Sequence, residues 1–209
     1  MKKLLYFSLF IFAFCACTST PKTESQAEIK EKSFDELFKA IEPADIPENV
    51  FKLVATDNIV ITAGTAASGY NSMVASDGGM GILMQKPVTF CGLRGSRYTL
   101  ELILRDQKYT MCFFEEEYRE QFMPFGKISG RDSNKMQETA LSAVETPSGR
   151  MAFKEAKLII ECDLAQTHTV NPEECYKEKN KTFFEDAFNE VGSYHKIVFG
   201  DITNVWVRK

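Results

Sequence analysis

The sequence is poor in the residues from which metal centres and hydrolytic active sites are usually built. It contains 2 histidines and 6 cysteines, and no two cysteines stand in a CxxC pair. Zinc and iron–sulfur sites need such ligands clustered at short spacing, so the composition argues against a metal centre. The absence of an HExxH segment and of a recognisable Ser-His-Asp arrangement argues against zinc proteases and triad hydrolases.

The chain also lacks an apolar run long enough to span a bilayer. Its longest run, residues 4–14, has about eleven residues, whereas a transmembrane helix needs roughly 20. Two lysines precede this run, and Cys17 follows it after the small residue Ala16. This order resembles a lipobox, so residues 1–17 are predicted to be a lipoprotein signal peptide with Cys17 as the acylated residue.

A lipid on Cys17 would anchor the protein to a membrane of the cell envelope, in the periplasm or at the outer membrane. Phe14 and Cys15 depart from the commonest lipobox, so an ordinary cleaved signal peptide and an uncleaved apolar N-terminus stay open as alternatives. Residues 18–33 are polar and contain no aromatic side chain, which predicts a flexible tether. Loss of the two lysines with the signal would change the formal net charge from −4 to −6, which argues against nucleic acid as a partner.

Residues 34–209 predict one domain in which strands dominate. We expect strands at 50–54, 58–63, 80–84, 88–93, 109–114, 151–163 and 195–207. We expect helices at 34–41 with Ser33 as its cap, and at 96–105, 115–123 and 132–142. Strands with a few short helices between them predict an α+β domain on a closed or partly closed sheet, without distinguishing a barrel from a sandwich.

Four cysteines of this domain have no assigned role. An envelope location permits disulfides, and buried free thiols explain the same residues equally well. The pattern leaves both states open for Cys91, Cys112, Cys162 and Cys175.

Three segments carry residues suited to holding a ligand, and the first is residues 69–81. This segment is dense in glycine and in small or hydroxyl-bearing side chains. Small side chains let backbone groups approach a flat ligand, and serine and asparagine add hydrogen-bond donors. A generic glycine-rich turn between strands is the alternative explanation.

The second segment is residues 93–99, where a strand is expected to end and a helix to begin. Arg94 and Arg97 flank that helix start, and Ser96 or Thr99 could cap it. Backbone amides and guanidinium groups at a helix N-terminus favour a phosphate. Two solvated surface arginines are the alternative.

The third segment, residues 125–135, also opens an expected helix. Asp132 or Ser133 is the expected cap, and Lys135 is expected one turn into the helix. A capped surface helix explains the same residues without a ligand.

Taken in order, these segments resemble the FMN-binding split-barrel flavin reductases, in particular their flavoredoxin-like branch. The matching patterns are Asn-Ser-Met-x-Ala-Ser at 71–76, Lys-Pro at 86–87, Leu-Arg-x-Ser-Arg-Tyr-Thr at 93–99 and Phe-Gly-x-x-Ser-Gly-Arg-Asp-x-x-Lys at 125–135. A further match begins at His195, followed five residues later by glycine and an acidic–aliphatic pair. The commoner members have Gly-Asp directly before this histidine, where this chain has Gly192-Ser193-Tyr194.

The resemblance runs from about residue 50 to the C-terminus and implies an FMN-binding split β-barrel with short peripheral helices. It also implies a homodimer that shares its sites. The residues that would line the edge of the isoalloxazine, mostly through backbone groups, are Asn71, Ser72, Met73, Val74, Ala75 and Ser76. Those that would hold the phosphate or the ribityl chain are Arg94, Ser96, Arg97, Tyr98 and Thr99. Those that would close the phosphate end, if necessary from the partner subunit, are Ser129, Gly130, Arg131 and Lys135.

His195 is the candidate catalytic residue, because the resemblance places it near the nicotinamide or substrate side. A strand histidine satisfied by a backbone carbonyl is the alternative. The function implied is that of an FMN-dependent oxidoreductase, which passes hydride or electrons through the bound flavin and takes them from NAD(P)H in the flavin reductase reading.

Export raises an objection to that donor, because reduced nicotinamides are not expected to accumulate outside the cytoplasm. We therefore expect electrons from another small molecule or from a membrane redox protein. One alternative function is a non-enzymatic FMN-binding electron-transfer module that serves an envelope redox partner. Another is a split barrel that has lost flavin and binds a different planar ligand.

Overall fold

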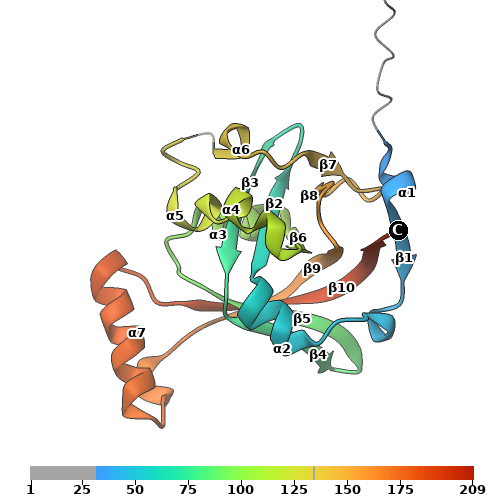
Figure 1. Ribbon diagram of the computed structural model, residues 1–209. Coiled ribbons are helices and arrows are strands. Elements are labelled where there is room, and N and C mark those ends of the chain that lie inside the picture. Colours follow the sequence, from blue (N-terminus) through green and yellow to red (C-terminus); the bar gives the residue numbers. More distant parts are fainter. Residues whose placement is uncertain (1–31, 134) are drawn as a thin grey trace, which may run out of the picture. The chain divides into compact units, whose positions relative to one another are not determined.

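A curled antiparallel sheet forms the body of the domain. The computed structural model describes residues 32–133 and 135–209, and within them eight strands pair in the order β3-β2-β6-β9-β10-β5-β4, with β1 on the far end of β10 (Figure 1). The strands are β1 Phe38–Ile41, β2 Ile59–Thr65, β3 Gly69–Ala75, β4 Gly78–Leu83, β5 Lys86–Leu93, β6 Lys108–Phe113, β9 Leu158–Thr169 and β10 Lys196–Arg208. A separate hairpin pairs β7 Ala143–Glu145 with β8 Met151–Phe153.

Strand β10 joins the part of the sheet formed by β3, β2, β6 and β9 to the part formed by β5 and β4. It pairs with β9 along most of its length, while its residues 196–201 pair with β5 and 205–208 pair with β1. Irregular register at Gly200 bends the strand. A Cβ atom at Gly200 would lie 2.2 Å from Oη of the buried Tyr109, so the glycine lets this side chain approach the backbone of β10.

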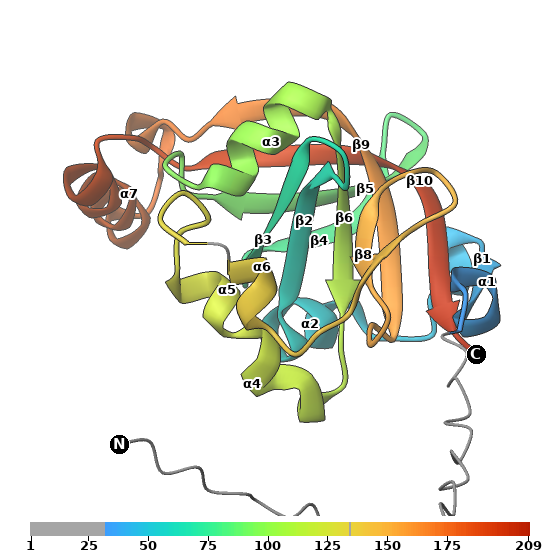
Figure 2. The same ribbon diagram turned by 90° about the horizontal axis from the view of Figure 1, so that it is seen from above.

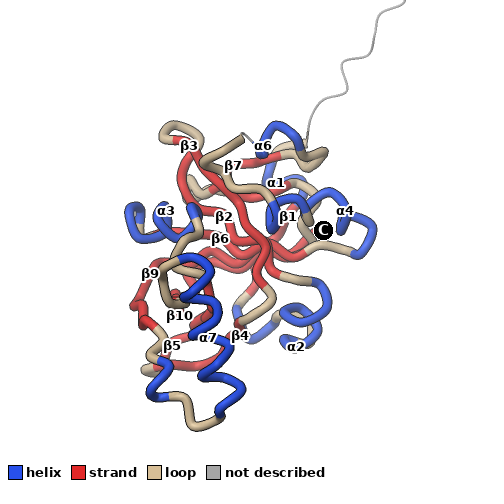
Figure 3. The backbone as a smooth tube through the Cα atoms, turned by 90° about the vertical axis from the view of Figure 1, so that its left-hand side faces the viewer, coloured by secondary structure: helices blue, strands red, loops and turns tan. Residues whose placement is uncertain are grey.

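Helices lie around the sheet rather than within it (Figure 2, Figure 3). They are α1 Phe34–Leu37, α2 Val50–Lys52, α3 Tyr98–Asp106, α4 Arg119–Phe122, α5 Pro124–Lys127, α6 Lys135–Glu138 and α7 Glu178–Val191. Short 3₁₀ turns at Pro43–Asp45, Glu116–Tyr118 and Pro172–Glu174 and a π-helical turn at Leu53–Asp57 complete the helical part. Helix α7 belongs to the connection between β9 and β10 and projects to one side of the sheet (Figure 1).

Two apolar clusters on opposite faces of the sheet form the core. Neighbouring residues alternate between them, as strand geometry requires: Ile59 and Ile61 belong to one cluster, and Val60 between them to the other. The second cluster is rich in phenylalanine, with Phe114, Phe122, Phe125 and Phe153 all buried. Burial of each large apolar side chain stabilises the fold by about 1.5–3 kcal/mol.

The expectation of a mainly β domain of the α+β class with short peripheral helices is confirmed. Strands expected at 58–63, 80–84, 88–93, 109–114 and 195–207 correspond to β2, β4, β5, β6 and β10. The helix expected at 96–105 corresponds to α3. Their apolar periodicity was strong enough to identify the element type.

The strand expected at 50–54 was wrong, because these residues form α2 and part of the π-helical turn. Asn49 caps this helix, its Oδ1 accepting hydrogen bonds from the N–H groups of Phe51 and Lys52 at 2.9 and 3.2 Å. A short apolar run does not by itself distinguish a strand from a helix, and here the Asn49 cap favours the helix.

The helix expected at 34–41 ends at Leu37, and residues 38–41 form β1 against the end of β10. Strand pairing thus overrides the helical spacing of the apolar residues. Ser33 is nevertheless the N-cap residue, and its backbone N–H donates to Glu36 Oε2 at 2.7 Å.

Other expected elements are shorter or broken. The strand expected at 151–163 divides into β8 and β9. The helix expected at 115–123 divides into a 3₁₀ turn and α4, and among the described residues of 132–142 only α6 forms. Strands β1, β3 and β7 and helix α7 were not expected.

Cys91, Cys112, Cys162 and Cys175 are free thiols in this structure, and the first three are fully buried. Burial raises the pKa of Cys112 and of Cys162 to about 12, so both stay protonated at neutral pH. Among residues 32–133 and 135–209, no group of three His, Cys, Asp or Glu side chains is placed to hold a metal ion.

The predicted signal peptide, Cys17 and residues 18–31 of the predicted tether lie outside the described residues. None of the helices in residues 32–133 and 135–209 combines the length and the apolar character needed to cross a membrane.

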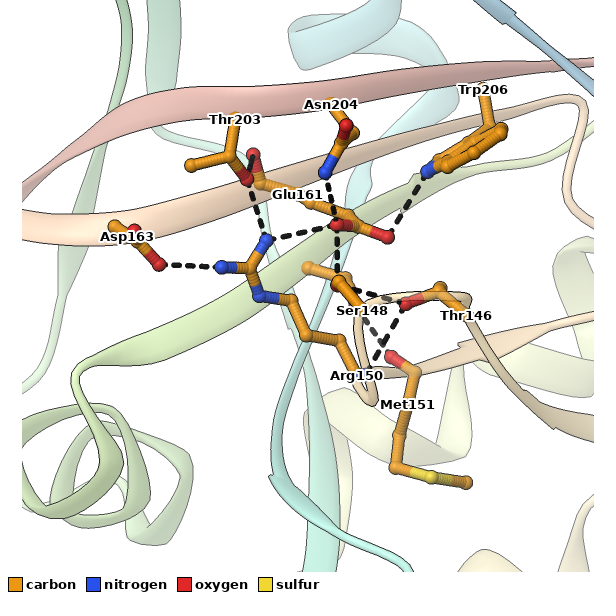
Figure 4. A network of polar contacts seen from close by, with 10 residues as sticks. Thr146, Ser148, Arg150, Met151, Glu161, Asp163, Thr203, Asn204 and Trp206 are labelled. Atoms are coloured by element: carbon orange, nitrogen blue, oxygen red, sulfur yellow. Dashed lines mark hydrogen bonds and ion pairs between the residues drawn. The ribbon is translucent and has the colours of Figure 1, made fainter.

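A buried ionic network fixes the β7–β8 hairpin to the sheet (Figure 4). Arg150 donates to Glu161 Oε2 at 2.9 Å and to Asp163 Oδ1 at 2.5 Å. Burial opposes ionisation of Glu161, but hydrogen bonds outweigh it and lower the pKa of this carboxyl group overall. The side chains that donate these bonds are Ser148, Thr146, Asn204 and Trp206.

Candidate functional site

A cavity of about 330 Å³ opens between β3, the start of α3, the α5–α6 segment and the end of α7. Ten of the fifteen residues predicted to bind the cofactor line it: Asn71, Met73, Arg94, Ser96, Arg97, Tyr98, Thr99, Ser129, Gly130 and Lys135. The remaining lining residues are Gly126, Lys127, Ile128 and Val191. The described lining therefore carries four cationic side chains and no carboxylate, in a chain with an overall negative charge. We call it the anion cavity.

The N-terminus of α3 forms one wall of the anion cavity. Its N-cap residue is Arg97, and no side chain caps it, so the expectation that Ser96 or Thr99 would do so was wrong. The first N–H groups of α3 therefore have no side-chain acceptor and favour an anion. Arg97 donates to the carbonyl oxygen of Gly126 at 3.1 Å, and burial together with nearby Arg94 lowers its pKa.

Lys135 forms a buried part of the cavity wall. Its Nζ donates to the carbonyl oxygens of Phe125 and Ile128, at 2.9 and 2.8 Å, and so fixes the turn between α5 and α6. Burial and the charge of Arg97 lower the pKa of Lys135 to about 8. An anion between these two cations would relieve their repulsion.

Lys135 begins α6, so the expectation that it lies one turn into a helix was wrong. The Ser133 hydroxyl has no described hydrogen-bond partner, so it does not cap this helix.

Asn71 connects the sheet to α3 at the floor of the anion cavity. Its Nδ2 donates to Thr99 Oγ1 at 2.7 Å, and both residues are buried. A Cβ atom at Gly130 would lie 2.1 Å from Asn71 Oδ1, so only glycine lets the backbone come this close. These three residues hold the three cavity-lining segments together.

Five predicted residues lie outside the anion cavity. Residues 71–75 belong to β3, not to a turn, and strand alternation turns Ser72 and Val74 away from the face that carries Asn71 and Met73. Ser72 instead bonds Thr62, Oγ to Oγ1, at 2.7 Å. Val74 contacts Gly126 and so lies behind the wall. Ala75 is buried in the core, and Ser76 is exposed.

Arg131 also stays outside the lining and supports it from behind. Its guanidinium donates to the carbonyl oxygen of Ser96 at 2.9 Å, pairs with Glu101 and lies 5.2 Å above the ring centre of Tyr98. These contacts hold the loop before α3 in place.

Residues 51–209 match the flavin reductase like domain family. The chain belongs to this family. Solved structures with the same fold include the FMN-binding protein from Thermus thermophilus with bound p-hydroxybenzaldehyde, at 17% identity and a TM-score of 0.56, covering 72% of this chain and 70% of that one. Flavoredoxin of Desulfovibrio vulgaris (Miyazaki F) matches at 20% identity and a TM-score of 0.55, covering 73% and 69%.

The FMN-binding domain of a flavin reductases-like enzyme from Shewanella baltica OS155 matches at 13% identity and a TM-score of 0.58, covering 81% and 76%. These likenesses confirm the predicted split-barrel fold. Among curated proteins, no relative matches.

This member of the flavin reductase like domain family places His195 in a different cavity. That second cavity, about 320 Å³, is lined by Asp77, Gly92, Asn180, Phe183, Phe184, His195 and Ile197. His195 is 7% exposed, and its Nδ1 is buried without a described hydrogen-bond partner. Burial and the charge of Arg94 lower the pKa of His195 more than Asp77 raises it. The imidazole is therefore neutral at pH 7, and no backbone carbonyl satisfies its Nδ1.

Helix α7 contacts both cavities and was missed by the sequence analysis. Val191 at its end lines the anion cavity, while Phe183 and Phe184 line the second one. Glu190 pairs with Arg94, Nη1 to Oε2, at 2.9 Å. The spacing of Phe184, Phe188 and Val191 and the glycine after them could have indicated a helix with a C-cap.

Proposed function

We propose that this protein binds FMN in the anion cavity and acts as an oxidoreductase of the flavin reductase type. The observation that carries the proposal is the four cations around an uncapped helix N-terminus, with no carboxylate among the described lining residues. Such a set of donors is well suited to a phosphate monoester. The structural neighbours include FMN-binding proteins, a flavoredoxin and a flavin reductase, which supports the same ligand class.

The residues fit the two ends of this cofactor differently. Arg97, Lys135, Ser96 and the first N–H groups of α3 would hold the phosphate. Asn71 and Met73 would lie beside the flat part of the ligand, where β3 offers an apolar and an amide contact. When bound, the flavin supplies the hydride or electron transfer, and the protein supplies position and electrostatics.

A titration of the full-length protein with FMN tests this assignment. Arg97→Ala should weaken FMN binding by about 10- to 100-fold, the effect of losing hydrogen bonds to a charged group. Arg105→Ala is the matched control, because Arg105 lies on the same helix but is exposed and pairs with Asp106. Riboflavin lacks the phosphate, so its weaker binding should not change in Arg97→Ala. Equal FMN affinity in Arg97→Ala and the wild type would contradict the proposed site.

The electron donor is part of the proposal. If Cys17 carries a lipid, the protein works in the envelope, where we propose that a reduced small molecule or a membrane redox protein replaces NAD(P)H. Rapid FMN reduction by micromolar NADH or NADPH would contradict this. Retention of FMN through gel filtration without turnover would instead identify an electron-transfer module, and exchangeable flavin would favour the reductase.

We also propose that the protein is a homodimer anchored through Cys17. Exposed Phe188 and Val191 on α7 give an apolar surface next to the anion cavity that a second copy could cover. Sedimentation of the full-length protein tests the dimer, and release of Cys17→Ser from membranes tests the anchor.

A further inference from the structure

The connection between β9 and β10 builds a second cavity that the proposed flavin site does not use. Residues 170–195 join the two paired strands, and α7 within them brings Phe183 and Phe184 against His195. The ring centres of Phe183 and Phe184 lie 5.7 and 5.4 Å from that of His195. The floor comes from the sheet, through Gly92 of β5 and Ile197 of β10.

We propose that this second cavity binds a small neutral aromatic molecule with a hydroxyl group, which hydrogen-bonds Nδ1 of His195. Two phenylalanines and an imidazole offer ring faces and edges to a planar ligand. A buried nitrogen without a described partner is costly unless a ligand or water satisfies it. The volume, about 320 Å³, is at the lower end of the range of ligand sites, roughly 300–1,000 Å³, and suits one or two rings.

The side chains that line the second cavity favour a neutral ligand over an anion. Asp77 is the ionisable lining residue besides His195, and its carboxylate disfavours an anion. The neutral imidazole does not attract an anion either, because burial and Arg94 lower its pKa. Arg94 and Arg97, whose charges also act on His195, line the anion cavity and not this one, so we expect an anion to bind in the anion cavity and a neutral ring in the second cavity.

The two cavities lie close together because they share α7. Phe184 and Val191 are seven residues apart on this helix, which corresponds to about 10 Å along its axis. A molecule in the second cavity would therefore lie next to the anion cavity. This inference does not depend on FMN binding, because it rests on a different set of residues.

The probe for this site is 4-fluorophenol, followed by ¹⁹F NMR with full-length protein, both without and with FMN. Fluorobenzene reports on ring burial alone, and 4-fluorobenzoate reports on charge. The wild type should bind 4-fluorophenol in competition with fluorobenzene at one site, and should not bind 4-fluorobenzoate there. His195→Phe should weaken 4-fluorophenol by about two- to ten-fold, the size of one net hydrogen bond, and leave fluorobenzene unchanged.

Gly92→Ala tests the position of the site independently of His195. The added Cβ would lie 3.5 Å from Asp77 Cβ and 3.7 Å from Ile197 Cδ1, ordinary contact distances, so the variant should fold while its methyl group reduces the cavity. Both aromatic probes should bind at least about three-fold more weakly, because the methyl group takes space that the ring needs. Gly81→Ala on β4 is the control, since its Cβ meets no atom within 4 Å and it does not line this cavity.

Three results would overturn the proposal. They are the absence of 4-fluorophenol binding by the wild type, unchanged binding in a folded Gly92→Ala, and an equal loss of both probes in His195→Phe. None of them would affect the proposed FMN site, whose test uses Arg97.

Discussion

Arg94 and Glu190 form an ion pair, with 2.9 Å between Nη1 and Oε2, that joins the loop before α3 to the last turn of α7. Their side chains are 40% and 62% exposed, so the pair itself contributes only about 0–1 kcal/mol to stability. We expect its main effect to be on ligand binding in the anion cavity, because Glu190 would compete with a phosphate for Arg94.

Glu190→Gln should therefore strengthen FMN binding. The removal of this competing carboxylate should lower the Kd by about two- to five-fold at low salt, and less at high salt because exposed charges are screened. Flavin fluorescence measures the change. Glu185→Gln provides the control, because Glu185 lies on the same helix and approaches Lys181 instead. Weaker binding by Glu190→Gln would show that this pair organises the site rather than competing with the ligand.

The affinity of the protein for FMN should fall between pH 7 and pH 9 because Lys135 titrates in this range. Burial and the charge of Arg97 lower its pKa to about 8, so it loses its positive charge over this range. The phosphate stays a dianion, because its second pKa is about 6. Binding titrations at pH 7, 8 and 9 measure the fall, and Lys135→Met should remove the pH dependence as well as part of the affinity.

The stability of the ligand-free protein should change with pH in the opposite direction. The folded pKa of Lys135, about 8, lies below the ordinary value of 10.5, so the unfolded chain binds more protons between these values. The contribution of Lys135 to the free energy of unfolding therefore rises as pH increases from about 8 to 10.5 and is constant below that window. Chemical denaturation with and without FMN separates the two effects; parallel changes in both would contradict the role of Lys135 at the anion.

The order of short motifs along the chain was enough to predict the family, the split barrel and most of the anion cavity. Arg94, Arg97 and Lys135 were found because a helix N-terminus and a basic side chain leave a local pattern. Residues 72 and 74 were included because β3 was not expected as a strand. Had it been, side-chain alternation would have removed them.

Long-range packing explains the rest of what the sequence did not show. Residues 38–41 follow a helical spacing, yet their pairing with β10 decides their structure, and the partner is more than 160 residues away. The second cavity needs Gly92 and Phe184 together, which no local pattern indicates. Arg131 has the motif of a ligand-binding residue but contacts Ser96 and Glu101, a choice that only the folded chain defines.

The buried ion pair of Arg150 and Glu161 should contribute strongly to the stability of the fold. Arg150→Met leaves the fully buried Glu161 carboxylate without its cation, which should lower the free energy of unfolding by about 3–5 kcal/mol. The double variant Arg150→Met, Glu161→Leu should be less destabilised, because both charges are gone. Urea denaturation measures both, and additive losses would argue against coupling between the two residues.

The pH dependence of this network has a definite sign. The folded pKa of Glu161 is lowered below 4.5, so its contribution to stability is present above that value and is lost as the pH falls through the folded pKa. The wild type should therefore lose stability below about pH 4.5, the ordinary Glu range. Glu161→Gln should reduce this slope, and an unchanged slope would assign the acid sensitivity to other carboxyl groups.

A substitution of Gly200, the glycine five residues after His195, tests whether this position serves packing or ligand binding. A Cβ atom there would lie 2.2 Å from Tyr109 Oη, 2.8 Å from its ring carbon Cζ and 2.9 Å from Cys162 Cβ, all inside the core. Gly200→Ala should therefore destabilise the fold by about 1–3 kcal/mol, as overpacked cores do. Adding Tyr109→Phe removes the closest atom and should recover part of that loss, although the ring carbon and Cys162 remain. Such partial recovery, with unchanged FMN affinity in the folded fraction, would show that the motif needs glycine at this position for the curvature of β10. Loss of FMN binding without loss of stability would place Gly200 at the ligand instead.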